Sequence, residues 1–128
     1  MKFYKCEICG KIVEMVEATS VPTICCGQPM EELLPGTTDG AVEKHLPVVQ
    51  VDGNAVHVCV GSAEHPMTPE HSIRWIALET KNGVRQCKTL SPDQRPVATF
   101  WLDPDDQAEA VYEYCNLHGL WKEEYPFQ

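Results

Sequence analysis

Four cysteines near the N-terminus have the residue types and spacing of a metal site. Cys6 and Cys9 are separated by two residues, and Cys25 and Cys26 are adjacent. A Cys-x2-Cys turn directs two thiolates toward one point, and sites with four sulfur ligands hold zinc or iron. Adjacent cysteines that bind one ion should impose a distorted tetrahedron. The spacing favours a metal strongly and iron over zinc only slightly, with a structural zinc, or free or disulfide-bonded thiols, as the alternatives.

A second candidate group combines histidines with one C-terminal cysteine. Cys115 and His118 form a Cys-x2-His pair after an expected strand, and His45, His65 and His71 fall in expected loops or at strand ends. Imidazole suits iron, copper, zinc and nickel, and a thiolate shifts the preference toward softer or redox-active metals. Spacing alone is weak evidence here, because a single histidine is more often a surface or core residue than a ligand.

The remaining histidine and two further cysteines follow a different pattern. His57 lies in the middle of an expected strand, where it and Cys59 share the face opposite to that of three valines. We therefore interpret His57 as a structural position. Cys59 and Cys87 are interpreted as buried or idle thiols.

The elements that must position these side chains are short and extended. Within residues 1–36, strands are expected at 2–5 and 12–16, followed by a turn at 25–30. A segment this short cannot bury enough apolar surface to order itself without a metal or disulfides. The segment from Pro35 to Gly40 has the composition of a linker.

From residue 41 onward, turn signals separate short apolar runs. Asp52-Gly53-Asn54 and Lys81-Asn82-Gly83 are hairpin signals. One short helical turn fits at 105–109. The expected strands are 48–51, 55–60, 73–79, 84–90, 97–102 and 110–114, with 117–122 as the expected continuation of the last one. This pattern is typical of an antiparallel β-sandwich. The expected fold class is mostly β, with a small metal-bound module at 1–36 and a sandwich at 37–128.

Composition limits the partners that the chain can have. The 128 residues carry a net charge of −9, which argues against nucleic acid and anionic membranes as partners. No apolar run approaches the ~20 residues that span a bilayer, and residues 1–10 lack the apolar region of a signal peptide. Seven cysteines without such a signal predict a reducing compartment, the cytoplasm. An anionic substrate would need a local positive feature.

Several segments in the same order resemble the desulfoferrodoxin family over nearly the whole chain. Lys5–Gly10 and Cys25–Met30 resemble its N-terminal desulforedoxin-like module. Four further segments resemble its C-terminal neelaredoxin-like domain: Glu43–Pro47, His65–Met67, His71–Ile76 and Cys115–Trp121.

The resemblance implies two non-haem iron ions per chain. The first iron would be held in a distorted rubredoxin-like site by Cys6, Cys9, Cys25 and Cys26. The second would have Cys115 as its axial ligand and four equatorial histidines, His45, His65, His71 and His118. The resemblance also implies an immunoglobulin-like sandwich and a homodimer.

The activity that the resemblance implies is superoxide reductase. Superoxide would be reduced by one electron to hydrogen peroxide at the ferrous His4Cys site, and rubredoxin or a similar carrier would return the electron. Glu43 would occupy the open position of the ferric iron after turnover. Lys44 would attract the anion and orient a proton-donating water. For both residues, a solvated charged pair is the alternative interpretation.

Three other functions compete with this interpretation. An electron-transfer or metal-storage protein would use the four-thiolate site and would not react with superoxide. A zinc-ribbon interaction module would be colourless and would hold zinc alone. A superoxide dismutase would evolve oxygen as well as peroxide, and the thiolate and the need for an external electron donor disfavour it.

Overall fold

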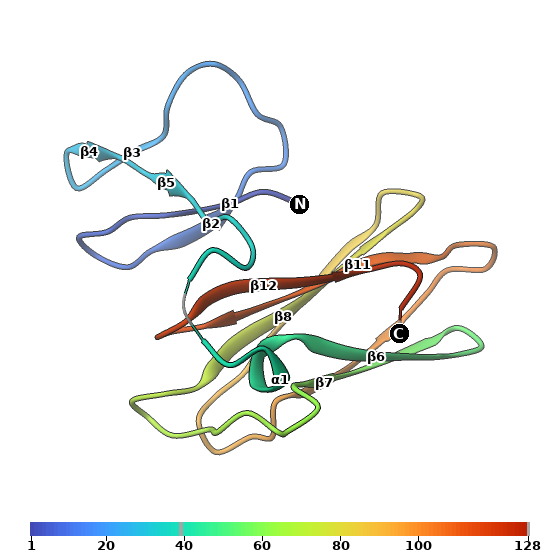
Figure 1. Ribbon diagram of the computed structural model, residues 1–128. Coiled ribbons are helices and arrows are strands. Elements are labelled where there is room, and N and C mark those ends of the chain that lie inside the picture. The colour runs from blue at the N-terminus through green and yellow to red at the C-terminus, as the bar shows by residue number, and fades with distance from the viewer. Residues whose placement is uncertain (39, 128) are drawn as a thin grey trace. The chain divides into compact units, whose positions relative to one another are not determined.

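The computed structural model describes residues 1–38 and 40–127, and its regular secondary structure is almost all β-strand (Figure 1). The chain divides into two compact units, Met1–Leu34 and Pro35–Gln128. The expected boundary after residue 36 falls two residues later than this division. Asp39, which belongs to the expected linker, lies outside the described residues.

The first unit is a small sheet with an additional hairpin. Its five strands are β1 (Phe3–Lys5), β2 (Ile12–Glu14), β3 (Ile24–Cys25), β4 (Gln28–Pro29) and β5 (Glu31–Glu32). The sheet has the order β2-β1-β5, and β3 pairs with β4. Several large apolar side chains of this unit are exposed: Ile8, Val16, Val21, Ile24 and Leu34. So few residues are buried that metal ligation must supply much of the order of this unit.

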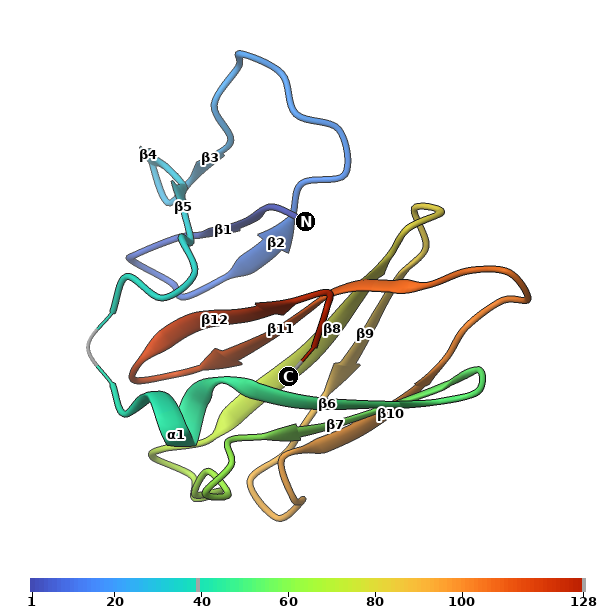
Figure 2. The same cartoon turned by 45° about the vertical axis from the view of Figure 1, so that its right-hand side comes forward.

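The second unit is a sandwich of two antiparallel sheets (Figures 1 and 2). One sheet has the order β10-β7-β6 and the other has the order β12-β11-β8-β9. A short helix, α1 (Val42–His45), precedes the first strand of the sandwich. The strands are β6 (Pro47–Asp52), β7 (Ala55–Val60), β8 (Ile73–Thr80), β9 (Arg85–Thr89), β10 (Val97–Trp101), β11 (Ala108–Cys115) and β12 (Gly119–Glu124). The division into three and four strands is that of an immunoglobulin-like sandwich.

The core lies between the two sheets and follows from alternation along the strands. Val56, Val58 and Val60 of β7 are buried, whereas His57 between them is exposed. Ile76 and Leu78 of β8 fill the core from the opposite sheet. Burying a side chain of this size stabilises the fold by ~1.5–3 kcal/mol. The core therefore fixes the register of the strands whose ends carry the histidines.

One open side of the sandwich is closed by side chains. β9 and β10 belong to different sheets. The Nε2 amide of Gln86 donates a hydrogen bond to the carbonyl of Trp101 (2.9 Å), and Nζ of Lys88 donates to the carbonyl of Val97 (3.3 Å). These bonds occupy carbonyl groups on a strand edge that could otherwise pair with another chain.

The two hairpin predictions are confirmed, and the helix prediction is wrong. Asp52 and Ala55 close the β6–β7 turn, and β8 and β9 flank the second predicted turn. No helix forms at 105–109: Asp105 has a φ of 65°, and Ala108 already pairs with Thr80 in the sheet. The described part of the chain instead has its helix at α1. Pairing with β8 provides backbone partners that an isolated helical turn could not offer.

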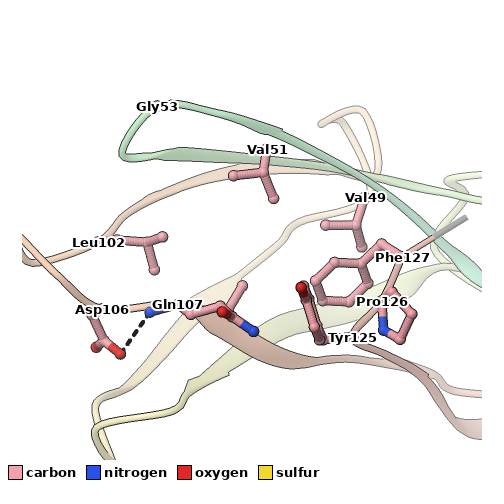
Figure 3. Close-up of a pocket in the computed structure, with 10 residues that line it drawn as sticks. Val49, Val51, Gly53, Leu102, Asp106, Gln107, Tyr125, Pro126 and Phe127 are labelled. Carbon is pink, nitrogen blue, oxygen red and sulfur yellow. Dashed lines mark hydrogen bonds between the residues drawn. The ribbon is translucent and has the colours of Figure 1, made fainter.

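A cleft of about 350 Å³ opens between β6 and the C-terminal segment (Figure 3). Its lining is mainly apolar and includes Val49, Val51, Leu102 and Phe127. The cleft extends toward Gly53, at the end of β6 remote from His45, and holds none of the predicted ligands. Among the described residues, no helix is both long and apolar enough to cross a bilayer.

Candidate metal centres

The structure brings the four predicted thiolates of the first unit together. Cys6 and Cys9 lie in the turn after β1, and Cys25 and Cys26 lie at the β3–β4 turn. The Sγ atoms of Cys9 and Cys25 are 3.6 Å apart, and those of Cys25 and Cys26 are 4.0 Å apart. All four sulfurs lie within 4.8 Å of one another. Zn–S bonds of ~2.3 Å place the sulfurs of a tetrahedral site about 3.8 Å apart, so this group fits one metal ion.

Proton sharing within the cluster also fits a metal site. A hydrogen bond from the Cys9 amide lowers the pKa of Cys6 to about 6. The hydrogen bond with the Cys9 thiol raises the pKa of Cys25 to about 12. Cys6 is therefore largely a thiolate at neutral pH, whereas Cys25 holds a proton that a metal would displace, because the thiolate is the form that binds.

The second group is built at one end of the sandwich by three separate segments. His45 ends α1, directly before β6. His65 and His71 lie in the loop between β7 and β8. Cys115 ends β11, and His118 lies in the turn to β12. α1, the β7–β8 loop and the β11–β12 turn lie at the same end of the sandwich in both views (Figures 1 and 2).

The four imidazoles form a closed ring in the order His45, His65, His71, His118. Each neighbouring pair has centroids 4.5–5.1 Å apart and planes inclined by 72–82°. Nε2 of His45 is 3.2 Å from Nε2 of His65 and 3.1 Å from Nδ1 of His118. Sγ of Cys115 approaches the same nitrogens of His65 (3.4 Å) and His118 (3.8 Å).

These distances match one ion with four nitrogen ligands and one sulfur ligand. Metal–nitrogen bonds of ~2.1 Å place ligands at right angles about 3 Å apart. The five donor atoms lie within 4.8 Å of one another. Nε2 of His71 is buried and finds no hydrogen-bond partner among the described residues. A buried ring nitrogen without a partner beside three other imidazoles is what a metal would satisfy.

The surroundings favour the neutral form of three of the imidazoles and orient two of them. Burial lowers the pKa of His65 to about 4 and also lowers the pKa values of His45 and His71. Nδ1 of His45 donates to the carbonyl of Ala41, and Nδ1 of His65 donates to the carbonyl of Pro66, each over 2.7 Å. These bonds leave Nε2 of both rings as the free acceptor that binds a metal.

Two further features around this centre were not predicted from the sequence. A Cβ on Gly40 would lie 3.1 Å from Cβ of His118 and 3.2 Å from Cε1 of His45, so the backbone packs directly against both rings. Glu113 is fully buried on the same face of β11 as Cys115, and burial raises its pKa to about 9. The alternation of side chains along a strand predicts that Glu113 and Cys115 lie on the same face, but only the structure shows that this face is buried.

The remaining predicted residues lie outside the cluster of donor atoms. Glu43 and Lys44 are exposed residues of α1, directly before His45. His57 points away from the core and its Nδ1 is 3.0 Å from Oγ1 of Thr99, which agrees with a structural position. Cys59 is half-buried and Cys87 is exposed, and neither belongs to a ligand group among the residues described.

The fold and the two centres define a mostly β metalloprotein with a four-thiolate site and a four-histidine, one-cysteine site. The sequence model described as "Desulfoferrodoxin" matches residues 37–124, and "Desulfoferrodoxin, N-terminal domain" matches residues 1–33. Desulfoferrodoxin of Nitratidesulfovibrio vulgaris is 46% identical over 123 residues, which cover 96% of this chain and 95% of that protein.

Solved structures agree with the sequence matches. The superoxide reductase from Treponema pallidum is 41% identical with a TM-score of 0.81, covering 96% of this chain and 98% of that chain. "Superoxide reductase (1Fe-SOR)" from Giardia intestinalis is 33% identical with a TM-score of 0.55, covering 63% of this chain and 95% of that chain. The chain belongs to the desulfoferrodoxin family. The two groups of donor side chains fit two iron sites per chain.

Proposed function

We propose that the chain is a superoxide reductase that reduces superoxide by one electron to hydrogen peroxide. The observation that carries the proposal is the ring of four imidazoles with the Cys115 thiol beside it. The five donors would hold one iron ion and supply one ligand fewer than the six that an octahedral iron takes, which would leave room for a small anion. The relatives named superoxide reductase support the choice of anion. When bound, the iron supplies a redox centre that exchanges one electron.

In this proposal, residues 37–128 form the catalytic domain and residues 1–36 form a four-thiolate iron module. His45, His65, His71, His118 and Cys115 hold the catalytic iron. Cys115 is completely buried, so water does not reach its sulfur. As a thiolate ligand it would donate electron density to the iron. Cys6, Cys9, Cys25 and Cys26 hold the other iron.

Glu43 and Lys44 are the proposed catalytic residues. The net charge of −9 repels an anionic substrate, and the ammonium group of Lys44 supplies a local attraction next in sequence to a ligand. Lys44 also orients a water that donates protons to the product. Glu43 is proposed to occupy the open position after turnover.

The external partners are also proposals. A rubredoxin-like carrier returns the electron, because each reduction of superoxide consumes one electron that must come from outside the chain. By analogy with the family, we propose a homodimer in the cytoplasm, without nucleic-acid or membrane partners.

The first experiment measures iron and zinc per chain and the visible spectrum after ascorbate and after hexachloroiridate, in wild type and Cys115→Ser. We expect about two irons per wild-type chain, one for each ligand group, and loss of one set of bands in the variant. Pulse radiolysis then measures the reaction with superoxide. Iron-loaded protein that does not consume superoxide would refute the proposal, and evolution of oxygen would instead indicate a dismutase.

A further inference from the structure

The turn that follows β7 is bonded to the segment that carries the proposed catalytic pair. The amide of Ala63 donates to the carbonyl of Glu43 (3.0 Å), and Oγ of Ser62 donates to the same carbonyl (3.2 Å). The amide of Gly61 donates to the carbonyl of Leu46 (3.1 Å). Three consecutive residues therefore hold both ends of the short α1 segment, and we call them the Gly61–Ala63 turn.

Close contact between the turn and α1 requires glycine at position 61. Gly61 has a φ of +86°, which residues with a side chain rarely adopt. A Cβ there would lie 2.7 Å from the carbonyl oxygen and 2.8 Å from the carbonyl carbon of Lys44, and it would also collide with the carbonyl oxygen of Ala63. All three atoms are backbone atoms, so no change of rotamer could relieve the collision. A side chain at position 61 must push the Lys44 peptide away.

We propose that the Gly61–Ala63 turn is a positioning element for Glu43 and Lys44. Both side chains are exposed, and the backbone of α1 sets the points from which their charged groups extend. The peptide that Gly61 contacts joins Lys44 to the ligand His45. The turn thus fixes the charged pair relative to the five-ligand centre without contacting substrate or iron itself. The catalytic consequence rests on the proposed function, whereas the placement of the segment can be tested independently.

The same turn leads into His65, whose amide donates to the carbonyl of Val60 (3.2 Å). A change at Gly61 could therefore act through a ligand rather than through Lys44. The test must separate these two effects, so iron content and the visible spectrum are measured beside the rate constant.

The main comparison is Gly61→Ala against Gly83→Ala. Gly83 has nearly the same φ, +87°, but a Cβ there would meet nothing within 4 Å, and it lies in the β8–β9 turn. The control reproduces the backbone strain without the collision. In iron-loaded protein, we expect Gly61→Ala to lower the second-order rate constant with superoxide roughly tenfold. Gly83→Ala should react like wild type. Both variants should keep wild-type iron content and visible bands.

A double-mutant cycle tests whether the effect passes through Lys44. In a Lys44→Ala background, adding Gly61→Ala should change the rate constant no further. Equal rate constants for Gly61→Ala and Gly83→Ala would overturn the inference. So would a full additional loss in the Lys44→Ala background, or loss of iron from the His4Cys site alone, because each would assign the effect to something other than the charged pair.

Hydrogen exchange of the iron-loaded protein supplies a readout that is independent of activity. We expect faster exchange in the segment 42–47 in Gly61→Ala than in Gly83→Ala. Exchange that is equal in the two variants would refute the positioning role even if wild type failed to react with superoxide. If Gly61→Ala does not fold, Ser62→Ala decides instead, because it removes the hydroxyl bond to the Glu43 carbonyl and leaves the bond from the Ala63 amide and the glycine contact in place. Unchanged exchange and rate in that variant would overturn the inference.

Discussion

At the residue scale, burial shifts the pKa values of His65 and Cys115 in the five-ligand centre in opposite directions. Burial lowers the pKa of His65 to about 4, so its imidazole is neutral at physiological pH and presents a free lone pair. Burial acts in the opposite direction on the Cys115 thiol and raises its pKa. The positive charge of a metal would favour the thiolate again, which links loss of the thiol proton to metal binding.

The types of the ligand residues could be predicted from the sequence, but their surroundings could not. Cys115 and His118 are close in the chain, and the family motifs identify the other histidines. The roles of Gly40 and Gly61 were missed, because a close contact between distant backbone segments has no local sequence signal. A glycine in the sequence indicates only that a close backbone contact is possible at that position, and it does not identify the segment that makes the contact.

Replacing Lys44 with alanine should slow the capture of superoxide. Loss of the charge removes a local attraction in an acidic protein, so the rate constant should fall roughly tenfold and depend less on ionic strength. Pulse radiolysis at low and high salt measures both effects. Lys81→Ala, at an exposed lysine of the β8–β9 turn, is the matched control. An unchanged rate in Lys44→Ala would exclude the proposed role.

Replacing Gly40 with valine should weaken the His4Cys site. The new side chain must displace the rings of His118 or His45, which a Cβ alone would already approach to 3.2 Å. We expect iron affinity at this site to fall about 10- to 100-fold, as for other changes that disturb ligand orientation. Competition with a chelator measures the affinity. The control is Gly53→Val, since a Cβ at Gly53 would meet nothing within 4 Å and this turn lies remote from His45; equal iron retention in the two variants would contradict the prediction.

At the element scale, strands joined by glycine turns are the predictable part of the fold. Asp52-Gly53-Asn54 marks the β6–β7 hairpin because a tight turn needs a residue that tolerates positive φ, and Gly53 has a φ of +59°. α1 could not be predicted: it has four residues and no side-chain N-cap, so bonds to the Gly61–Ala63 turn, and not local propensity, hold it.

Replacing Gln86 with alanine should destabilise the contact between β9 and β10. The variant loses the hydrogen bond to the Trp101 carbonyl, and one such bond contributes about 0.5–1.5 kcal/mol to the free energy of unfolding. Urea unfolding of the iron-loaded protein measures the change. Thr89→Ala, at an exposed position of the same strand, should stay close to wild type. Equal midpoints for the two variants would show that the bond does not stabilise the sandwich.

At the scale of the whole molecule, each candidate centre takes all of its ligands from one unit. The four cysteines lie within Met1–Leu34, and the other five donors lie within Pro35–Gln128. The first unit exposes much of its apolar surface, whereas the second has a core shared by two sheets. Composition indicated this division, because no metal-free core could form in a segment as short as residues 1–36.

Replacing Cys9 with serine should therefore unfold the first unit alone. Without its metal, the segment 1–34 should exchange its amides rapidly, while the sandwich keeps its protection and its iron. Hydrogen-exchange mass spectrometry with iron analysis measures both. Glu7→Ser changes an exposed residue of the same turn and should keep both irons. Loss of protection in the sandwich of Cys9→Ser would show that the two units do not fold separately.

The five-ligand centre also has a mechanical consequence. His45 precedes β6 of one sheet, and His118, 73 residues later, lies beside β12 of the other. An ion bound to both histidines would cross-link the two sheets at one end of the sandwich. The two sheets cannot separate at that end until a metal–ligand bond breaks. The rate of iron loss should therefore limit the rate at which the sandwich unfolds, whether unfolding is followed by proteolysis or by pulling on the chain.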